Sequence, residues 1–350
     1  MQIALDTLGG KHAPDAMVAG AIQATERWEG LTICLVGDPK LLMKHIDRLK
    51  GDPSRFTFFE SQSLITEAEN PVEALEAKPD ASINVALDAH QRNEVDAVVS
   101  AGSTGAQIVA SIRSLGLLEG VIRPAIGSYF PSLNGKTFVL DVGANVHCRP
   151  INLLQFAAMG AIFRQHLDGI ENPRVGILSN GEEKSKGTQT TREAYELMDI
   201  IPAMNFVGYV EGRDIYKNKA DVVVCDGFMG NVLLKFAETI PEMLKHCSEM
   251  LNMDEKSIRD MYANMLRSFD YQEFGGVPLL GINGISMICH GDSTPKAITS
   301  AIGEAMKMVK LRVNDKIAEQ LTTMGHWSAI IKTKALLERF RRRRLSGEKN

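Results

Sequence analysis

The sequence predicts a three-layer α/β fold, in which helices cover both faces of a mostly parallel sheet. Short apolar runs alternate with helical stretches along almost the whole chain, which is the pattern of consecutive βαβ units. Several of these runs end in a polar residue followed at once by a Gly-rich loop, as at the carboxyl ends of strands in open α/β sheets. A chain of 350 residues can form one large domain. We therefore expect a single two-lobed domain over residues 1–310 and a helical basic tail over residues 311–350.

Nine segments are predicted as strands because they are short, rich in apolar and β-branched residues, and bounded by turn residues. Helices are expected in the intervals between them. Pro14 and Asp15 are typical of a helix start, since a proline in the first turn removes no intrahelical hydrogen bond. The predicted strands are 2–6, 32–36, 55–59, 97–100, 125–129, 137–141, 174–178, 206–209 and 221–225.

One internal region departs from this alternation. Residues 231–268 read as two consecutive helices, divided near residues 252–254, with Asn231 capping the first helix and Pro241 kinking it. A helical hairpin that projects from an α/β domain is commonly an oligomerisation element or a lid.

Composition and charge exclude several classes of protein. The formal net charge is −4, whereas a nucleic-acid-binding domain is expected to be basic. The five cysteines are dispersed without a CxxC pair, which favours reduced thiols over a zinc site. Neither a signal peptide nor an apolar run of about 20 residues is evident, so we expect a cytoplasmic protein whose membrane contact, if any, is peripheral.

The C-terminal tail has the opposite charge to the rest of the chain. From residue 332 onward it carries eight Lys and Arg residues and two Glu, a local charge of +6. Such a segment is either a solvated helix end or an electrostatic docking site for anionic lipid or an acidic carrier protein.

Four Gly-rich loops follow predicted strands and are the candidate substrate-binding elements. Because the carboxyl ends of parallel strands lie at one edge of a sheet, we expect these loops to meet in one crevice. Glycines there let backbone N–H groups approach an anion, and a helix that starts in such a loop adds its positive end. The expected substrate-binding residues are Asp6, Gly9, Gly10, Gly102, Ser103, Thr104, Gly105, Asp141, Asn145, Asp226, Gly227 and Gly230.

Two further loops supply ionisable candidates. Lys186 precedes Gly187 in a charged loop after a predicted strand, and His290 precedes Gly291 and Asp292 after an apolar run. A loop lysine is usually solvated, and a lone histidine is as often structural as catalytic. The chain carries no GxGxxG, P-loop, GxSxG or HExxH motif, which counts against nucleotide-binding, dehydrogenase, hydrolase and zinc-enzyme classes.

Taken together, the loops resemble those of the phosphate acyltransferase family (PlsX) of bacterial phospholipid synthesis. The resemblance covers residues 1 to about 310 and is strongest in three segments, with shorter matches at 5–14, 99–106, 123–126 and 205–214. The three segments are 137–160 (TFVLDVGANVHCRPINLLQFAAMG), 220–235 (ADVVVCDGFMGNVLLK) and 271–292 (YQEFGGVPLLGINGISMICHGD).

The resemblance implies a fold like that of the phosphotransacetylases and the isocitrate and isopropylmalate dehydrogenases, working as a homodimer. It implies transfer of a long-chain acyl group from acyl carrier protein to inorganic phosphate, without a metal or organic cofactor. The product, acyl phosphate, would serve a membrane glycerol 3-phosphate acyltransferase. The helical hairpin at 231–268 matches the family's dimer-interface hairpin, which can touch the membrane.

The resemblance also assigns roles to the candidate residues. Lys186 would neutralise phosphate or the oxyanion, Asn231 would supply an amide donor, and His290 would orient phosphate or protonate the departing thiol. Gly102, Ser103, Thr104 and Asn145 would hold phosphate.

At some positions the chain departs from the family pattern. Lys11 stands where the family has an acid, and Glu76 stands where it has an Arg, so Glu76 puts a negative charge where an anion site favours a positive one. Other departures are Ser103 for Asn, His147 for Asp and Thr239 for Gly. Two alternatives therefore stay open: a diverged paralogue that uses another acyl acceptor, and a non-catalytic scaffold that binds acyl carrier protein.

Overall fold

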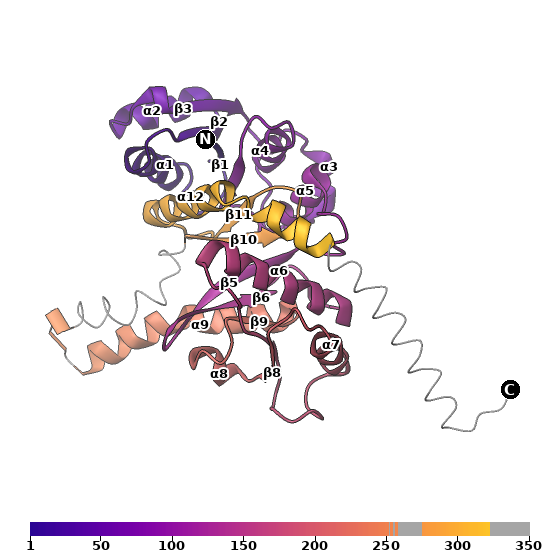
Figure 1. The fold of residues 1–350 in the computed structure, drawn as a ribbon. Helices are drawn as coiled ribbons and strands as arrows, with labels where there is room; N and C mark the ends of the chain where they lie inside the picture. The colour runs from indigo at the N-terminus through magenta and orange to yellow at the C-terminus, as the bar shows by residue number, and fades with distance from the viewer. Residues whose placement is uncertain (252, 255, 258–274, 323–350) are drawn as a thin grey trace, which may run out of the picture.

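The described strands form one eleven-stranded sheet with helices on both faces, in a computed structural model that describes residues 1–251, 253–254, 256–257 and 275–322. The strand order is β3-β2-β1-β4-β11-β10-β5-β6-β9-β7-β8 (Figure 1). The predicted three-layer α/β class is confirmed.

The nine predicted strands are all present: two have the predicted bounds, and the boundaries of the others shift by one to three residues. The strands are β1 (Gln2–Asp6), β2 (Thr32–Gly37), β3 (Phe56–Glu60), β4 (Ala97–Ser100), β5 (Ala125–Ser132), β6 (Gly135–Leu140), β7 (Val175–Leu178), β8 (Phe206–Val210), β9 (Val222–Val224), β10 (Gly276–Leu280) and β11 (Ser286–Cys289). The helices are α1 (Asp15–Arg27), α2 (Pro39–Arg48), α3 (Pro71–Ala77), α4 (Ser82–Gln91), α5 (Thr104–Leu115), α6 (Pro150–Asp168), α7 (Gln189–Asp199), α8 (Gly212–Tyr216), α9 (Gly227–Met250) and α12 (Pro295–Lys310), with a short 3₁₀ turn at Pro53–Arg55.

The two faces of the sheet bury two separate hydrophobic clusters. Because side chains alternate along a strand, Ile3 and Leu5 enter one cluster, whereas Ala4 between them enters the other. Helices α1, α2, α6, α7 and α12 contribute to the first cluster, and α3, α4, α5, α8 and α9 contribute to the second. This arrangement gives the three layers that the alternating pattern predicts.

The two halves of the sheet are joined where β10 pairs with β5. Both β10 and β6 run antiparallel to β5, and the β10–β5 pairing comprises Leu279 with Ile126 and Leu280 with Ala125. The other pairings are parallel, apart from β10 with β11. Neither β10 nor β11 is among the nine predicted strands. The segment of β11 was noted only as an apolar run before His290, and Pro278 and Gly276, both unusual inside a strand, interrupt the apolar pattern of β10.

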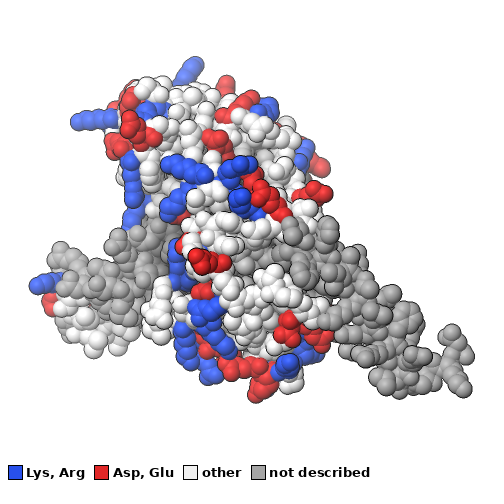
Figure 2. All heavy atoms as spheres, viewed as in Figure 1, with Lys and Arg blue, Asp and Glu red and all other residues white. Residues whose placement is uncertain are grey.

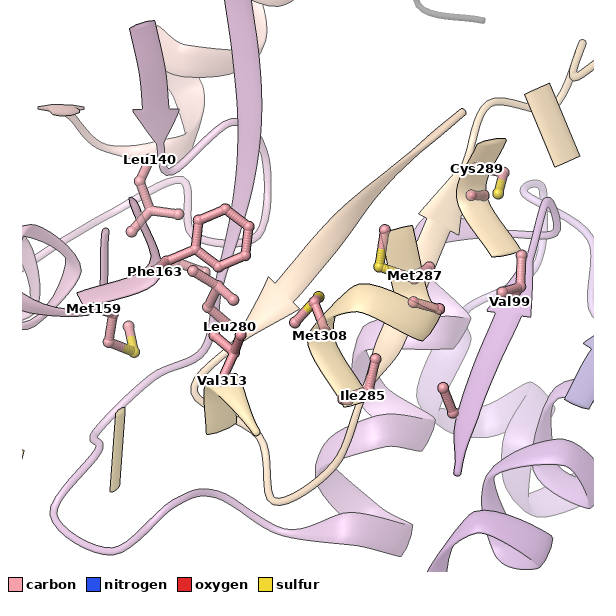
Figure 3. Packing of buried hydrophobic residues seen from close by; sticks show 14 of the residues in the cluster. Val99, Leu140, Met159, Phe163, Leu280, Ile285, Met287, Cys289, Met308 and Val313 are labelled. Atoms are coloured by element: carbon pink, nitrogen blue, oxygen red, sulfur yellow. The ribbon is translucent and has the colours of Figure 1, made fainter. Parts of the chain in front are cut away.

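The core is continuous across this junction. Figure 3 shows Leu280, Met308 and Val313 lying between Phe163 of one half and Met287 of the other. The boundary predicted at residue 310 is therefore too early: Val313, Ile317 and Leu321 are buried in the first cluster, since they continue the apolar periodicity of α12. The basic segment from residue 332 lies outside the described residues.

Helix α9 begins earlier than predicted. Its N-cap is Asp226, whose carboxylate accepts a hydrogen bond from the backbone N–H of Met229 at 2.8 Å, so Asn231 lies within the first two turns rather than at the cap. Pro241 lies inside the helix as predicted. Figure 1 shows α9 running outward beyond the body of the domain. The second helix predicted up to residue 268 falls largely outside the described residues.

The surface carries charges of both signs and some exposed apolar side chains. Figure 2 shows Lys and Arg intermixed with Asp and Glu over the visible face. On α9, large apolar side chains are exposed at Phe228, Val232 and Phe236. Among the described helices, none combines the length and the hydropathy needed to cross a bilayer.

Substituting Gly230 with Ala is expected to destabilise the protein strongly. A Cβ atom at this position would lie 1.9 Å from the backbone carbonyl oxygen of Asp141, and backbone cannot move aside as a flexible side chain can. We expect a loss of at least about 2 kcal/mol in the free energy of unfolding, measured by urea denaturation. The control is Gly212→Ala, where a Cβ meets nothing within 4 Å. Equal stability of the two variants would contradict the close approach of α9 to the Asp141 loop.

Candidate functional site

A cavity of about 1000 Å³ opens on the second face of the sheet, beside the β10–β5 junction. Its lining comes from segments far apart in the sequence: the loops after β1, β4, β6 and β11, the start of α9, and the strands β5 and β10. Each of the four Gly-rich loops thus contributes residues to one cavity, as predicted, although not every candidate residue lines it.

The candidate residues divide into those that line the cavity and those that do not. The lining includes Gly10, Gly102, Ser103, Thr104, Gly105, Gly227, Asn231 and His290. The other candidates, Asp6, Gly9, Asp141, Asn145, Asp226, Gly230 and Lys186, are not among the lining residues.

Asp6 organises two of the loops from beneath. Its carboxylate is buried and accepts hydrogen bonds from the backbone N–H groups of Leu8 at 3.0 Å and Gly9 at 3.2 Å. The Ser100 hydroxyl donates to it at 2.7 Å, and that hydroxyl in turn accepts from the N–H of Gly102. The loop after β1 and the loop after β4 are therefore tied through one carboxylate.

Asp141 has the same role in the other half. One carboxylate oxygen accepts from the N–H groups of Ile126, Gly143 and Ala144 at 3.0 to 3.2 Å. The second oxygen accepts from the backbone N–H and the amide of Asn145 at 2.7 and 2.9 Å. Burial raises the pKa of Asp141, and these hydrogen bonds oppose that rise. The carboxylate shapes the loop that faces the cavity and is itself covered by it.

Two helices start at the cavity. Ser103 caps α5, where its hydroxyl accepts from the N–H of Ala106, and Asp226 caps α9. The N–H of Gly227 donates to the Asn145 carbonyl at 2.7 Å, which ties α9 to the Asp141 loop. The first N–H groups of a helix lack intrahelical acceptors, and the dipole makes this end positive. The cavity therefore receives two helix ends suited to an anion.

Asn231 lies close to the Asp141 loop. A methyl group on Gly143 would lie 3.8 Å from the amide oxygen of Asn231, so the amide faces this glycine across the cavity wall. Asn231 follows Gly227 by four residues and thus shares its helix face. Because Gly227 bonds to the Asp141 loop, this four-residue spacing also brings Asn231 close to that loop.

His290 follows β11 and lines the cavity. Its Nδ1 accepts a hydrogen bond from the backbone N–H of Asp292 at 3.1 Å, so a neutral ring carries its proton on Nε2. The Asp292 carboxylate pairs with the ammonium group of Lys11 at 2.7 Å, and the N–H of Lys11 donates to the Gly291 carbonyl. The hydrogen bond from Lys11 lowers the pKa of Asp292, and the same bond raises that of Lys11. Lys11, where the family has an acid, thus connects the loop after β1 to the loop that carries His290.

Lys186 lies away from this group. It is exposed in the loop after β7, where its backbone N–H donates to the Glu183 carbonyl at 2.8 Å. The lysines that line the cavity are instead Lys11 and Lys235, and Lys235 pairs with Glu238 at 2.9 Å. Lys235 follows Asn231 by four residues, a spacing that could have identified it from the sequence.

Glu76, the other charge departure, is exposed in α3 and is not a lining residue. Near it, Lys78 pairs with Glu69 at 2.7 Å and donates to the Leu64 carbonyl at 2.8 Å. The hydrogen bond from Lys78 lowers the pKa of Glu69 to about 2. Lys78 therefore holds the segment from Leu64 to Glu69, which forms one wall of the cavity and which sequence reasoning missed. Among the residues that the structure describes, no group of three His, Cys, Asp or Glu side chains converges as a metal site.

The chain matches a family described as fatty acid synthesis protein over residues 1–316. It is 43% identical over 330 residues to a phosphate acyltransferase of Geobacter sulfurreducens, covering 92% of this chain and 95% of that protein. It is 44% identical over 329 residues to a phosphate acyltransferase of Heliobacterium modesticaldum, covering 92% and 98%.

Solved structures share the fold at low identity. A phosphotransacetylase from Streptococcus pyogenes superposes with a TM-score of 0.60 at 15% identity, covering 88% of this chain and 94% of that chain. A 4-hydroxythreonine-4-phosphate dehydrogenase from Klebsiella pneumoniae gives a TM-score of 0.52 at 11% identity, covering 88% and 98%. These similarities establish the type of fold, including its dehydrogenase-like relatives.

Replacing Asp141 with Ala is expected to unfold the cavity edge. The variant leaves the N–H groups of Ile126, Gly143 and Ala144 without their acceptor, and each such buried donor costs about 1–3 kcal/mol. We expect a loss of at least about 3 kcal/mol in the urea unfolding free energy. The matched control is Asp38→Ala, an exposed helix cap that accepts two N–H bonds, for which we expect about 1 kcal/mol. A loss no larger than that of the control would refute the supporting role of Asp141.

Proposed function

This chain belongs to the fatty acid synthesis protein family, as do the phosphate acyltransferases it resembles, and we propose that it transfers a fatty acyl group from acyl carrier protein to inorganic phosphate. It is an acyltransferase, and its product, acyl phosphate, serves phospholipid synthesis. The observation that carries the proposal is the convergence of Gly-rich loops and two helix N-termini on one large cavity.

The reaction needs placement more than a strong base. Phosphate is a nucleophile at neutral pH, and a phosphate oxygen attacks the thioester carbonyl. The new C–O bond forms as the C=O electron pair moves onto oxygen, which gives a tetrahedral oxyanion. Its collapse restores the carbonyl and breaks the C–S bond, and the departing thiolate takes up the proton that the phosphate group loses. A thiol pKa of about 8.5 makes this a good leaving group. Holding the two reactants together supplies several kcal/mol, and one well-placed oxyanion donor adds about 3 kcal/mol.

We assign phosphate to the loop after β4, where Gly102, Ser103 and Thr104 line the cavity at the start of α5. Backbone N–H groups and two hydroxyls there match the acceptor oxygens of phosphate. The charge of the anion is balanced by helix ends, since Lys11 and Lys235 already pair with carboxylates. The substrate residues outside the lining, such as Asp6 and Asp141, act by shaping the loops.

Asn231 and His290 are the proposed donors to the reacting groups. The Asn231 amide lies beside Gly143, where it can donate to the oxyanion. The His290 Nε2–H, defined by the hydrogen bond at Nδ1, can orient phosphate, and the ring protonated at both nitrogens can give a proton to the departing thiolate. Lys186 remains a proposed catalytic cation whose loop would have to approach the cavity when substrate binds.

We also propose that the protein acts as a homodimer and passes its product to a membrane glycerol 3-phosphate acyltransferase. The exposed apolar side chains of α9, among them Phe228, Val232 and Phe236, offer a surface for a second copy or for peripheral membrane contact. Sedimentation of the purified protein tests the dimer, and a single monomeric species at micromolar concentration would contradict it.

The direct test of the function is to incubate the purified protein with palmitoyl-acyl carrier protein, with and without inorganic phosphate. Acyl phosphate is trapped with hydroxylamine, and release of free carrier protein is followed in parallel. We expect acyl hydroxamate only when phosphate is present. Release of carrier protein with another acceptor instead would favour the diverged paralogue, and binding of carrier protein without turnover would favour the scaffold.

Substitution of the proposed donors should lower turnover without unfolding the protein. We expect Asn231→Ala to reduce kcat by about a hundredfold, as for loss of one oxyanion donor. The matched control is Asn172→Ala, because Asn172 is exposed and does not line the cavity. Loss of activity in both variants, or in neither, would count against the role of Asn231.

Lys186 is tested in the same assay against another lysine of its loop. Lys186→Ala should abolish most turnover if the loop reaches the cavity, whereas the exposed Lys184→Ala should not. Near-normal turnover of Lys186→Ala would remove Lys186 from the mechanism and leave the helix ends as the source of positive potential.

A further inference from the structure

The cavity is larger than phosphate and a thioester require, and its apolar part has a definite shape. Its apolar lining includes four buried residues of the second hydrophobic cluster, Ile65, Ile126, Phe130 and Ile288. This part of the cavity lies where β5 and β10 are no longer paired, beyond the junction of Ile126 with Leu279. A space opens there between the two halves of the sheet, with apolar side chains on its walls.

One wall is formed by β5, where residues 126 and 128–131 line the cavity. Ile126, Ser128 and Phe130 alternate along the strand and therefore point to the same side. The Tyr129 ring packs with Phe138 and Phe163, although Tyr129 also belongs to the lining. From Ile126 to Phe130 this wall is about 13 Å long.

The second wall is a single face of α9. Gly227, Asn231, Leu234 and Glu238 recur at intervals of three and four residues and all line the cavity. Leu234 also packs against the second cluster. From Gly227 to Glu238 this wall is about 16 Å long, comparable with the β5 wall.

Both walls start at the Gly-rich loops. Ile126 donates its N–H to Asp141, and Gly227 donates its N–H to the Asn145 carbonyl. Phe130 lies at the other end of the β5 wall, is 7% exposed, and precedes the turn whose Leu133 bonds to the Tyr216 carbonyl of α8. We call the space between Ile126, Ser128 and Phe130 on one side and Leu234 and Ala237 on the other the β5 trough.

We propose that the acyl chain of the substrate lies in the β5 trough, with its carbonyl at the Gly-rich loops and its methylenes running past Ser128 to Phe130. Phe130 then borders the far end of the trough, which the longer chains must pass, and Ser128 borders its middle. This inference rests on the acyl-transfer function proposed above. An acyl chain is the occupant that fits, because the walls are apolar, elongated, and begin where the thioester must react.

The test compares octanoyl-, lauroyl-, palmitoyl- and stearoyl-acyl carrier protein as donors for each variant. Ser128→Leu places a branched side chain in the middle of the trough. We expect its kcat/KM for palmitoyl relative to octanoyl donor to fall by about tenfold or more, as for added methylenes in a filled pocket. Phe130→Ala opens the far end and should raise the ratio of stearoyl to lauroyl turnover.

The controls separate the trough from general damage. Leu49→Ala truncates an exposed apolar side chain at the C-cap of α2, outside the cavity lining and outside the apolar surface of α9, and should leave the ratios unchanged. The two variants are expected to shift the preferred chain length in opposite directions. If Phe130→Ala does not fold, the donor ratios of Ser128→Leu alone still test the trough. Each ratio is internal to one protein and is insensitive to the fraction that is active.

The outcomes distinguish this inference from the proposed function. Unchanged ratios in Ser128→Leu, with wild-type protein making acyl phosphate, would overturn the trough and leave the function standing. Failure of wild-type protein to make acyl phosphate from any of the four donors would overturn the function and the trough together. A shift toward shorter donors in Ser128→Leu and toward longer donors in Phe130→Ala would support the assignment.

Discussion

The cavity depends most on the buried carboxylate of Asp141. It accepts N–H groups from the loop that follows β6 and from Ile126 at the start of the β5 wall. Ile126 is also one of the two residues of β5 that pair with β10. One carboxylate thus stabilises both the turn that faces the reaction site and the junction of the two halves of the sheet. A buried acceptor with this many donors is costly to replace, because each donor would lose its partner without gaining water.

The same architectural device appears in both halves. Asp6 supports the loops of one half and Asp141 those of the other, and each lies under the backbone that contacts the cavity. The carboxylates hold N–H groups of their own loops, while the helix starts at Ser103 and Asp226 bring further N–H groups to the cavity. An anion site built in this way gains its positive potential from fixed dipoles, which need little reorganisation during a reaction. Lys11 and Lys235 pair with carboxylates, which is consistent with helix dipoles rather than lysine charges supplying the positive potential.

Sequence reasoning located the strands and the loops better than the side chains that reach the cavity. An apolar run that ends at Asp and Gly is local information, so β1, β6 and β9 with their loops were predictable. Strand β10 was missed because Pro278 is tolerated there only through its place at the junction. Asp6 and Asp141 were predicted to bind substrate, and in the structure their carboxylates accept N–H groups of their own loops. In the sequence, a carboxylate next to glycines looks the same whether it faces a ligand or its own backbone. The start of α9 was placed at Asn231, because the capping role of Asp226 depends on which N–H group lies above it.

By itself the sequence determined the fold class and the positions of most strands and Gly-rich loops along the chain, since both follow from periodicity and from turn residues in short stretches. It also carried the family relationship, through motifs such as residues 220–235. The tertiary structure decided which residues share the cavity. It brought Lys11 to Asp292 across the chain, left Lys186 outside the lining, and placed Phe130 and Leu234 in the lining of one cavity. Such distances depend on how strands pair and how helices cross over the sheet, and these long-range arrangements are not encoded in any single stretch of sequence.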